Sequence, residues 1–130
     1  MNETDSLNSA GLAATLRRIE AGECSAIDVI NACFDRIETR EPDVGAWQVR
    51  LSRTGYLHNY QARQDFYQQS LLKGLPVGIK DIIDTADMPT AMGSPIHQGR
   101  QPIEDATCVA LIRAAGGIVL GKTVTTEFAY

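Results

Sequence analysis

The chain has 130 residues, of which 44% are hydrophobic and 22% are charged, and its 12 basic and 16 acidic residues give a formal net charge of -4. These values are typical of a globular protein that forms one domain or part of one. The basic residues are scattered, which argues against nucleic acid as a partner. The longest apolar runs are too short to cross a bilayer, so we expect no membrane association.

Three cysteines, Cys24, Cys33 and Cys108, form no CxxC pair and have no histidine at ligand spacing. We therefore expect free, reduced thiols that pack as small apolar side chains, with no disulfide, no metal and no cofactor. The first residues are polar and acidic, unlike a secretion signal. Together these features predict a cytoplasmic protein.

The first part of the chain predicts a helical hairpin. Apolar residues at helical spacing predict a helix over 9–21, with Gly22 at the position of a left-handed cap. Ser25, with Asp28 three residues later, predicts the start of a second helix, which we expect to end at Pro42.

The middle of the chain is less regular. Residues 46–50 suggest a short strand, and apolar and aromatic residues at helical spacing predict a third helix over 57–71.

The character of the sequence changes after residue 72. The run 75–83 is dense in apolar and β-branched residues, which is typical of a buried strand, and the long segment 84–104 is typical of a functional loop. Asp105 is a candidate cap for a helix that ends at Gly116-Gly117, and a second core strand follows at 118–120.

Strand, helix and strand form a βαβ unit, so the fold class is α/β, with a mixed sheet flanked by helices. We divide the chain into a helical part, 1–72, and a βαβ part, 73–130, of one domain. Two strands do not make a stable sheet, so we expect the domain to be truncated at its C-terminus and marginally stable alone.

Residues 116–123 satisfy the pattern GxxxxGK[ST] of a phosphate-binding loop. The context is inverted, because such a loop follows a strand and opens a helix, whereas here a helix precedes it. Ile118 and Val119 are also stiff, β-branched residues typical of a strand. A nucleotide-binding site is therefore the weakest of the functions considered.

Lys80 lies in the middle of an apolar run. Strand alternation places it on one face with Gly78 and Ile82, and places Asp81 on the other face. Burial favours the neutral form of a lysine and prepares it to accept a proton. The alternative is a lysine at a strand end that reaches water or pairs with Asp81 or Asp84.

Separated blocks of this sequence resemble, in order and in spacing, the front half of the amidase-signature family. The resemblance is strong from about residue 74 onward and loose over the N-terminal helices. It rests on the segments Gly74-Leu75-Pro76-Val77-Gly78-Ile79-Lys80-Asp81, Asp84-Thr85-Ala86-Asp87-Met88-Pro89-Thr90, Gly93-Ser94, Asp105-Ala106-Thr107, Leu111-Ile112-Arg113-Ala114-Ala115-Gly116-Gly117, Gly121-Lys122-Thr123 and Glu127-Phe128-Ala129.

The resemblance implies a hydrolase of carbon–nitrogen amide bonds with a Ser-cisSer-Lys mechanism, in which Lys80 is the catalytic lysine. Gly78 and Asp81 are weaker candidates for supporting roles. In that family both serines and the oxyanion loop follow the segment that matches 127–129, so we expect this chain to be inactive alone. Ser94 is interpreted as a loop residue, because Pro95 follows it and no Gly-x-Ser-x-Gly elbow surrounds it.

Two function classes therefore stay open. The first is an amidase whose N-terminal part this chain represents, acting on a small-molecule amide, with a homodimer as one option for its full-length form. The second is a non-catalytic fragment, or an assembly partner in an amidotransferase-like complex. Family members act on small amides, amino-acid amides, ureido compounds or aminoacyl-tRNA, and the sequence does not choose among them.

Overall fold

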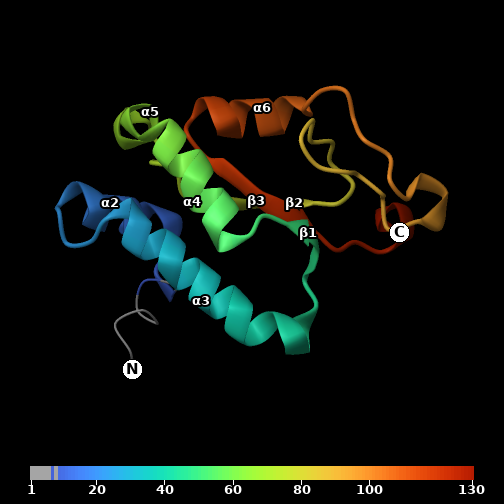
Figure 1. The fold of residues 1–130 in the computed structure, drawn as a ribbon, viewed down its shortest axis with the longest axis horizontal. Helices are drawn as coiled ribbons and strands as arrows, with labels where there is room; N and C mark the ends of the chain where they lie inside the picture. The colour runs from blue at the N-terminus through green and yellow to red at the C-terminus, as the bar shows by residue number, and fades with distance from the viewer. Residues whose placement is uncertain (1–6, 8) are drawn as a thin grey trace.

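The computed structural model describes Leu7 and residues 9–130 of the chain (Figure 1). Its helices and strands follow one another in the order α2 (Leu12–Glu20), α3 (Ala26–Val44), β1 (Trp47–Arg50), α4 (Arg53–Ala62), α5 (Gln64–Gln69), β2 (Pro76–Lys80), α6 (Thr107–Ala114) and β3 (Ile118–Thr123). Two short 3-10 helices, η1 (Pro95–His97) and η2 (Glu127–Ala129), complete the described part.

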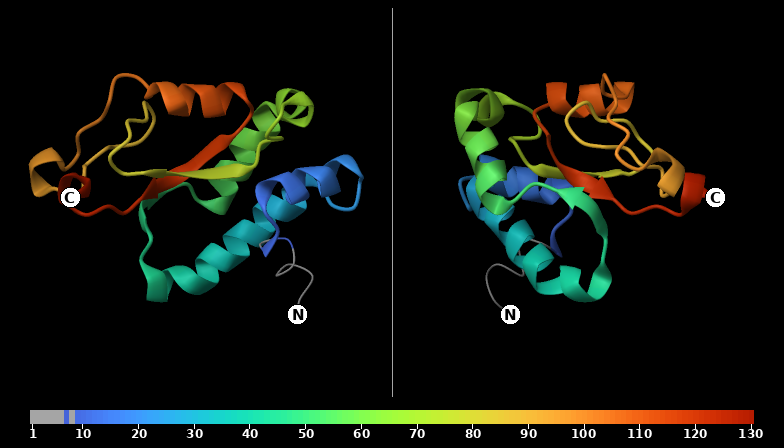
Figure 2. Two further views of the ribbon diagram at one scale, coloured as in Figure 1. Left: turned by 180° about the vertical axis from the view of Figure 1, so that it is seen from behind. Right: turned by 45° about the vertical axis from the view of Figure 1, so that its right-hand side comes forward.

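The three strands form one mixed sheet in the order β1-β3-β2. β2 and β3 are parallel and joined through α6, which confirms the predicted βαβ unit, and β1 pairs antiparallel with β3. The sheet therefore combines a strand from the helical part of the chain with two from the βαβ part. Helix α6 lies on one side of the sheet and α3 on the other (Figure 2). The predicted α/β class is confirmed.

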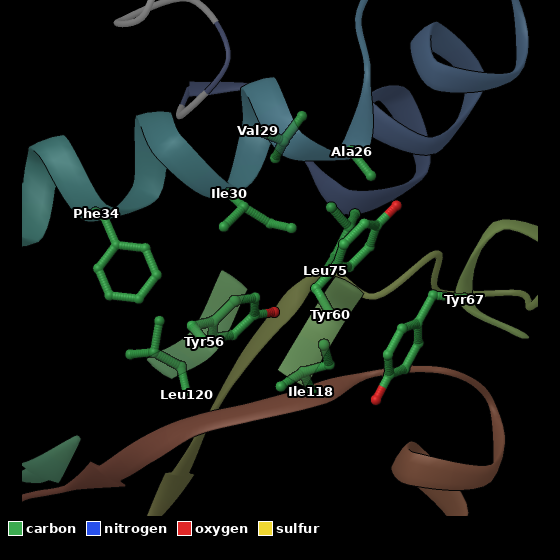
Figure 3. Packing of buried hydrophobic residues seen from close by; sticks show 10 residues of the cluster. All are labelled: Ala26, Val29, Ile30, Phe34, Tyr56, Tyr60, Tyr67, Leu75, Ile118 and Leu120. Atoms are coloured by element: carbon green, nitrogen blue, oxygen red, sulfur yellow. The ribbon is translucent and has the colours of Figure 1, made fainter. Parts of the chain in front are cut away.

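The larger hydrophobic core fills the space between α3, α4 and the sheet (Figure 3). Phe34 and Tyr56, both fully buried, meet edge to face with ring centroids 5.5 Å apart. The hydroxyl of Tyr56 donates a 2.7 Å hydrogen bond to the carbonyl of Gly74, so the polar end of this ring is satisfied inside the core. Burial raises the pKa of Tyr56 and keeps it neutral.

A smaller core lies under α6 on the opposite side of the sheet. Val109 of α6 packs with Ile79 of β2, Val119 of β3 and Met88 of the long loop. Since both faces of the parallel pair are covered at this point, the strands are apolar on both sides, as the sequence pattern predicts.

Helix α3 begins as predicted and ends later than predicted. The Ser25 hydroxyl accepts a hydrogen bond from the amide of Asp28, and the Asp28 carboxylate accepts one from the amide of Ser25, which completes a capping box. The prediction that Pro42 ends this helix is wrong, because the helix continues to Val44 and stops at Gly45 in the left-handed conformation. Pro42 lacks an amide hydrogen and so removes one hydrogen bond from the last turn, but the Glu41 carboxylate accepts from the amides of Ala46 and Trp47 and stabilises the helix end.

The predicted third helix is wrong as a single element. The backbone leaves the helical conformation at Arg63, where φ is -134°, and the segment divides into α4 and α5. The guanidinium of Arg63 lies 4.4 Å from the centroid of the Phe66 ring, a cation–π contact across the break.

Three further element boundaries can be compared with the predictions. Helix α2 begins at Leu12, after a bend at Ala10, whereas the prediction began this helix at Ser9; Gly22 after it has a positive φ of 73°, as predicted. The predicted cap of α6 is wrong, since Ala106 occupies that position while Asp105 accepts from the amide of Ala86 and pairs with Arg113. The predicted short strand at 46–50 is confirmed as β1.

Candidate functional site

Lys80 is the last residue of β2, at the carboxyl end of the parallel pair. Its side chain is exposed, so the expectation of a lysine buried by strand alternation is wrong for the chain as it stands. The reason is its place in the sheet: β2 is the outer strand, and the described residues supply no further strand beyond it. Lys80 therefore projects from a strand end that the rest of the described chain leaves open.

The face of β2 that carries Lys80 is shaped by Gly78 and Trp47. A β-carbon at Gly78 would lie 3.1 Å from Cη2 of Trp47 and 3.2 Å from Cγ2 of Thr123, so the indole occupies the room that the glycine leaves. Beside this contact lies a hollow of about 280 Å³, lined by Cys33, Arg36, Ile37, Trp47, Pro76, Gly78 and Leu120. The Lys80 face is therefore open and mostly apolar.

A bulge in β3 determines which side chains reach the opposite face. Val77 pairs with Val119, but its neighbour Gly78 pairs with Gly121, so Leu120 is an extra residue in β3. Beyond the bulge Lys122 is the partner of Ile79 and shares its face. The bulge thus turns Lys122 toward the α6 side, away from the face that carries Lys80.

Lys122 is fully buried and has three oxygen partners. Its ammonium donates to Oγ1 of Thr90 at 2.7 Å and to the carbonyl of Pro89 at 3.2 Å, and it lies 3.4 Å from Oδ1 of Asp81. Asp81 and Thr90 are themselves almost inaccessible, with 1% and 0% of their surface exposed. The ammonium is thus enclosed by a carboxylate, a hydroxyl and a carbonyl.

Burial lowers the pKa of Lys122 below its ordinary value, and the carboxylate of Asp81 opposes this shift. We interpret Lys122 as charged, because its nitrogen donates hydrogen bonds to the oxygen atoms of Pro89 and Thr90 and lies 3.4 Å from a third oxygen, Oδ1 of Asp81. A charge pair in such a site is costly to break, since removing one partner leaves the other buried and unpaired.

Asp81 follows Lys80 directly and fixes the chain beyond it. Its amide donates to the carbonyl of Thr123, and its carbonyl accepts from the amide of Met92, each at 2.8–2.9 Å. Its carboxylate accepts from the amide of Ala91 at 3.3 Å. Strand alternation predicted its position on the face opposite Lys80; the sequence did not predict its buried partner, Lys122.

Polar side chains tie the long loop 84–104 to itself and to the strands. Arg100 donates twice to the carboxylate of Asp84, at 2.7 and 3.0 Å, and Nε2 of Gln101 donates to the carbonyl of Ala86 at 2.8 Å. The amide of Thr90 donates to the carbonyl of Arg100. This loop is therefore folded and fixed by its own hydrogen bonds, while the functional role that its length predicts stays a prediction.

Replacing Asp84 with asparagine should make stability less sensitive to acid. Hydrogen bonds from Arg100 hold the pKa of Asp84 below its ordinary value. A carboxyl group with a lowered pKa in the folded state stabilises it above the unfolded value of about 4, and this contribution is lost as the pH falls through the folded value. Urea midpoints between pH 3 and 7 should fall less steeply for Asp84→Asn than for the wild type.

The control for that series is Asp43→Asn, which removes an exposed carboxylate on α3. Its midpoints should follow the wild-type pH profile. An Asp84→Asn profile that falls as steeply as the wild type between pH 7 and pH 3 would contradict the role given to Arg100.

Ser94 lies at the start of η1 and is buried, which agrees with its interpretation as a loop residue. Its hydroxyl donates to Oε1 of Glu127 at 2.7 Å, and the amide of Phe128 donates to the carbonyl of Met92. The last residues of the chain therefore pack against the loop, beside η1 (Figure 1). His97 contacts the Phe128 ring edge to face, and His58 is exposed on α4.

The segment that matches a phosphate-binding pattern, 116–123, contains strand β3, and its lysine is used inside the protein by Thr90 and Asp81. Within the part of the chain that the structure describes, no cluster of three histidine, cysteine, aspartate or glutamate side chains is arranged to hold a metal ion. In the same residues, no helix is long and apolar enough to cross a membrane.

The arrangement brings two lysines to the carboxyl end of the β2–β3 pair, on opposite faces. Lys80 is accessible to a ligand, while Lys122 is enclosed and holds the loop that follows Lys80. The sequence carried a signal for Lys122 as well, because it also ends an apolar run, 118–121. In the βαβ context that run predicts a core strand that ends in a lysine, but not the face of the sheet on which the lysine lies.

Known proteins with similar sequences are amidases and amidotransferase components. A model of the amidase family matches residues 28–130. An amidase of Pseudomonas putida is 32% identical over 127 residues, which cover 96% of this chain and 27% of that protein. One component of the glutamyl-tRNA(Gln) amidotransferase of Salinispora arenicola is 38% identical, over 99% of this chain and 26% of that component.

Solved structures agree with the sequence comparison. The native peptide amidase of Stenotrophomonas maltophilia superposes with a TM-score of 0.75 at 28% identity, over 92% of this chain and 26% of that one. The chain thus spans about a quarter of the length of the curated relatives that it matches.

Proposed function

This chain belongs to the amidase-signature family, and from that membership we propose that it supplies the lysine of an enzyme that hydrolyses carbon–nitrogen amide bonds. The observation that carries the proposal is the position of Lys80. It lies inside the matched region and ends a parallel strand, at the edge of the sheet where α/β proteins bind their ligands.

In the proposed reaction Lys80, in its neutral form, accepts a proton from a bridging serine. That serine accepts the proton of the nucleophilic serine, whose oxygen forms a bond to the amide carbon. Collapse of the tetrahedral intermediate breaks the carbon–nitrogen bond, and the proton held by Lys80 returns through the bridge to the leaving nitrogen. Water then releases the acid by the same relay.

The two serines and the oxyanion donors are proposed to come from polypeptide outside these 130 residues. The chain has only about a quarter of the length of its relatives, and in the family these groups follow the segment that matches 127–129. The same added polypeptide would cover the open face of β2 beside Gly78. Covering Lys80 would remove water from its ammonium and favour the neutral form that the relay needs.

The experiment compares the chain alone with a chimeric amidase, in which this chain replaces the segment that it matches in the Pseudomonas putida amidase. Ammonia release is measured with an amide that the parent enzyme hydrolyses. The chimera should hydrolyse the amide, and the chain alone should not. Hydrolysis by the chain alone that is lost in Lys80→Ala would contradict the proposal, as would a folded but inactive chimera.

A second function is favoured by one specific observation, the free outer edge of β2 in the described sheet. An unpaired strand edge is a surface on which another polypeptide can add a strand. We propose as the alternative that the chain assembles, without catalysing, with a partner in an amidotransferase-like complex, as its similarity to an amidotransferase component suggests. The test is co-purification of a partner protein with the chain. A partner that binds the wild-type chain and the Lys80→Ala variant equally well, in a complex whose activity does not depend on Lys80, would favour this alternative.

The substrate is proposed at the level of a small-molecule amide. One relative is a component of a glutamyl-tRNA(Gln) amidotransferase and one solved neighbour is a peptide amidase, so the named relatives share chemistry at an amide group and differ in the molecule that carries it. A cytoplasmic location and a homodimeric full-length form stay part of the proposal, and gel filtration of the full-length protein tests the second.

A further inference from the structure

We propose that Lys122 is a positioning residue, which acts through Asp81 to fix the backbone at Lys80 without touching the substrate. The inference rests on the proposed function, because it assigns Lys122 to the reaction of Lys80. Its observations are independent of that function: a fully buried ammonium, three oxygen partners and a bulge that directs the side chain to them.

The first step of the argument is the direction of Lys122. In a regular strand, alternation would place Lys122 on the same face as Ile118. The bulge places it on the face of Ile79 instead, against the segment 89–90 of the long loop. A bulge that re-aims one charged side chain into a buried site is typical of a functional region.

The second step is the connection to Lys80. Asp81 is the next residue in the chain, and its amide, carbonyl and carboxylate are all hydrogen bonded, to Thr123, Met92 and Ala91. Lys122 neutralises that carboxylate and also holds Thr90, so one ammonium joins the end of β2 to the loop. The peptide that carries Lys80 is thus fixed from its C-terminal side.

The third step is that the charge has no evident use other than this one. Lys122 is inaccessible to solvent, so it cannot contact a substrate in this arrangement. A buried charge pair is also a poor source of stability, because its desolvation offsets most of the attraction. Accurate placement is the benefit that remains, since a base displaced by about 1 Å can lose about a hundredfold in rate.

The test removes the ammonium and then returns it. Lys122→Ala deletes three methylene groups and the ammonium. Added propylammonium has the shape and the charge of the deleted part. 1-Propanol has a similar shape but carries a neutral hydroxyl in place of the ammonium. In the full 130-residue chain, hydrogen exchange of the Ala91 and Met92 amides should accelerate at least about tenfold and should slow again with propylammonium, but not with 1-propanol.

In the chimeric amidase the same variant should lower kcat by about 10- to 100-fold with KM nearly unchanged, and propylammonium should restore kcat. The matched control is Lys73→Ala, which removes an ammonium that donates to the carbonyls of Gln68 and Ser70 and not to any member of this cluster. It should change neither the two amides nor kcat.

A normal kcat per folded Lys122→Ala molecule would overturn the inference, even if its thermal midpoint falls. If Lys122→Ala does not fold, the double variant Lys122→Met with Asp81→Asn takes its place, because it removes both charges together. Normal hydrogen exchange at the Ala91 and Met92 amides, or a normal kcat, in this double variant would also overturn the inference. If the proposed function itself is wrong, the result is different: the chimera that carries Lys80→Ala would then be as active as the unmodified chimera.

Discussion

Replacing Lys80 with alanine in the chimeric amidase should lower kcat/KM by about a thousandfold. A positioned general base contributes about 10²- to 10⁴-fold to such reactions, and no neighbouring side chain in the described structure can replace this one on its face of β2. Lys122 cannot, since it is buried on the opposite face. The measurement is the initial rate of ammonia release at several substrate concentrations, with the folded fraction checked by circular dichroism.

Two variants control that experiment. Lys73→Ala removes another lysine and should leave the rate unchanged. Lys80→Arg keeps the positive charge but cannot be deprotonated, so it should be as inactive as Lys80→Ala if the lysine acts as a base. An active Lys80→Arg variant would show that only the charge matters and would contradict the proposed relay.

Replacing Phe34 with alanine should lower the free energy of unfolding of the chain by about 3–5 kcal/mol, as is usual for large buried aromatic residues. Phe34 is completely buried in the larger core, where its ring meets that of Tyr56 edge to face (Figure 3). The guanidinium of Arg53 lies 5.7 Å from the centroid of the same ring. Its loss would leave a cavity between α3 and α4. Such a loss of stability is a large fraction of the about 5–15 kcal/mol that stabilises a typical folded domain.

Urea unfolding followed by circular dichroism measures this loss. The matched control is Phe66→Ala, whose ring is 37% exposed and packs at the edge of Tyr67 on α5. It should cost about 1 kcal/mol or less. Equal losses for the two variants would mean that the core between α3 and the sheet is not packed as described.

Local rules predicted most of the elements, and tertiary contacts explain the exceptions. The capping box at Ser25 was predictable because both of its partners lie within four residues. The end of α3 was not, since the Glu41 carboxylate accepts from the amides of Ala46 and Trp47 and stabilises the helix end beyond Pro42. The break at Arg63 likewise depends on packing that spacing alone does not reveal.

The candidate site was predictable in part, for a similar reason. The βαβ pattern and the apolar run located Lys80 at the end of a parallel strand, and alternation placed Asp81 on the other face. The exposure of Lys80 depends on the strand order, which places β2 outermost in the described sheet. The burial of Lys122 depends on a bulge at Leu120, and a single inserted residue in a strand register leaves no clear local signature.

The central claim is that Lys80 activates a serine nucleophile, and the rate of covalent labelling of that serine tests it most directly. A fluorophosphonate probe reacts with an activated serine hydroxyl. The second-order rate constant for labelling of the chimeric amidase therefore reports how strongly the serine is activated, without any substrate turnover. We predict rapid labelling of the chimera and labelling at least about a hundredfold slower in Lys80→Ala. Equal labelling rates in the two folded proteins would contradict the claim.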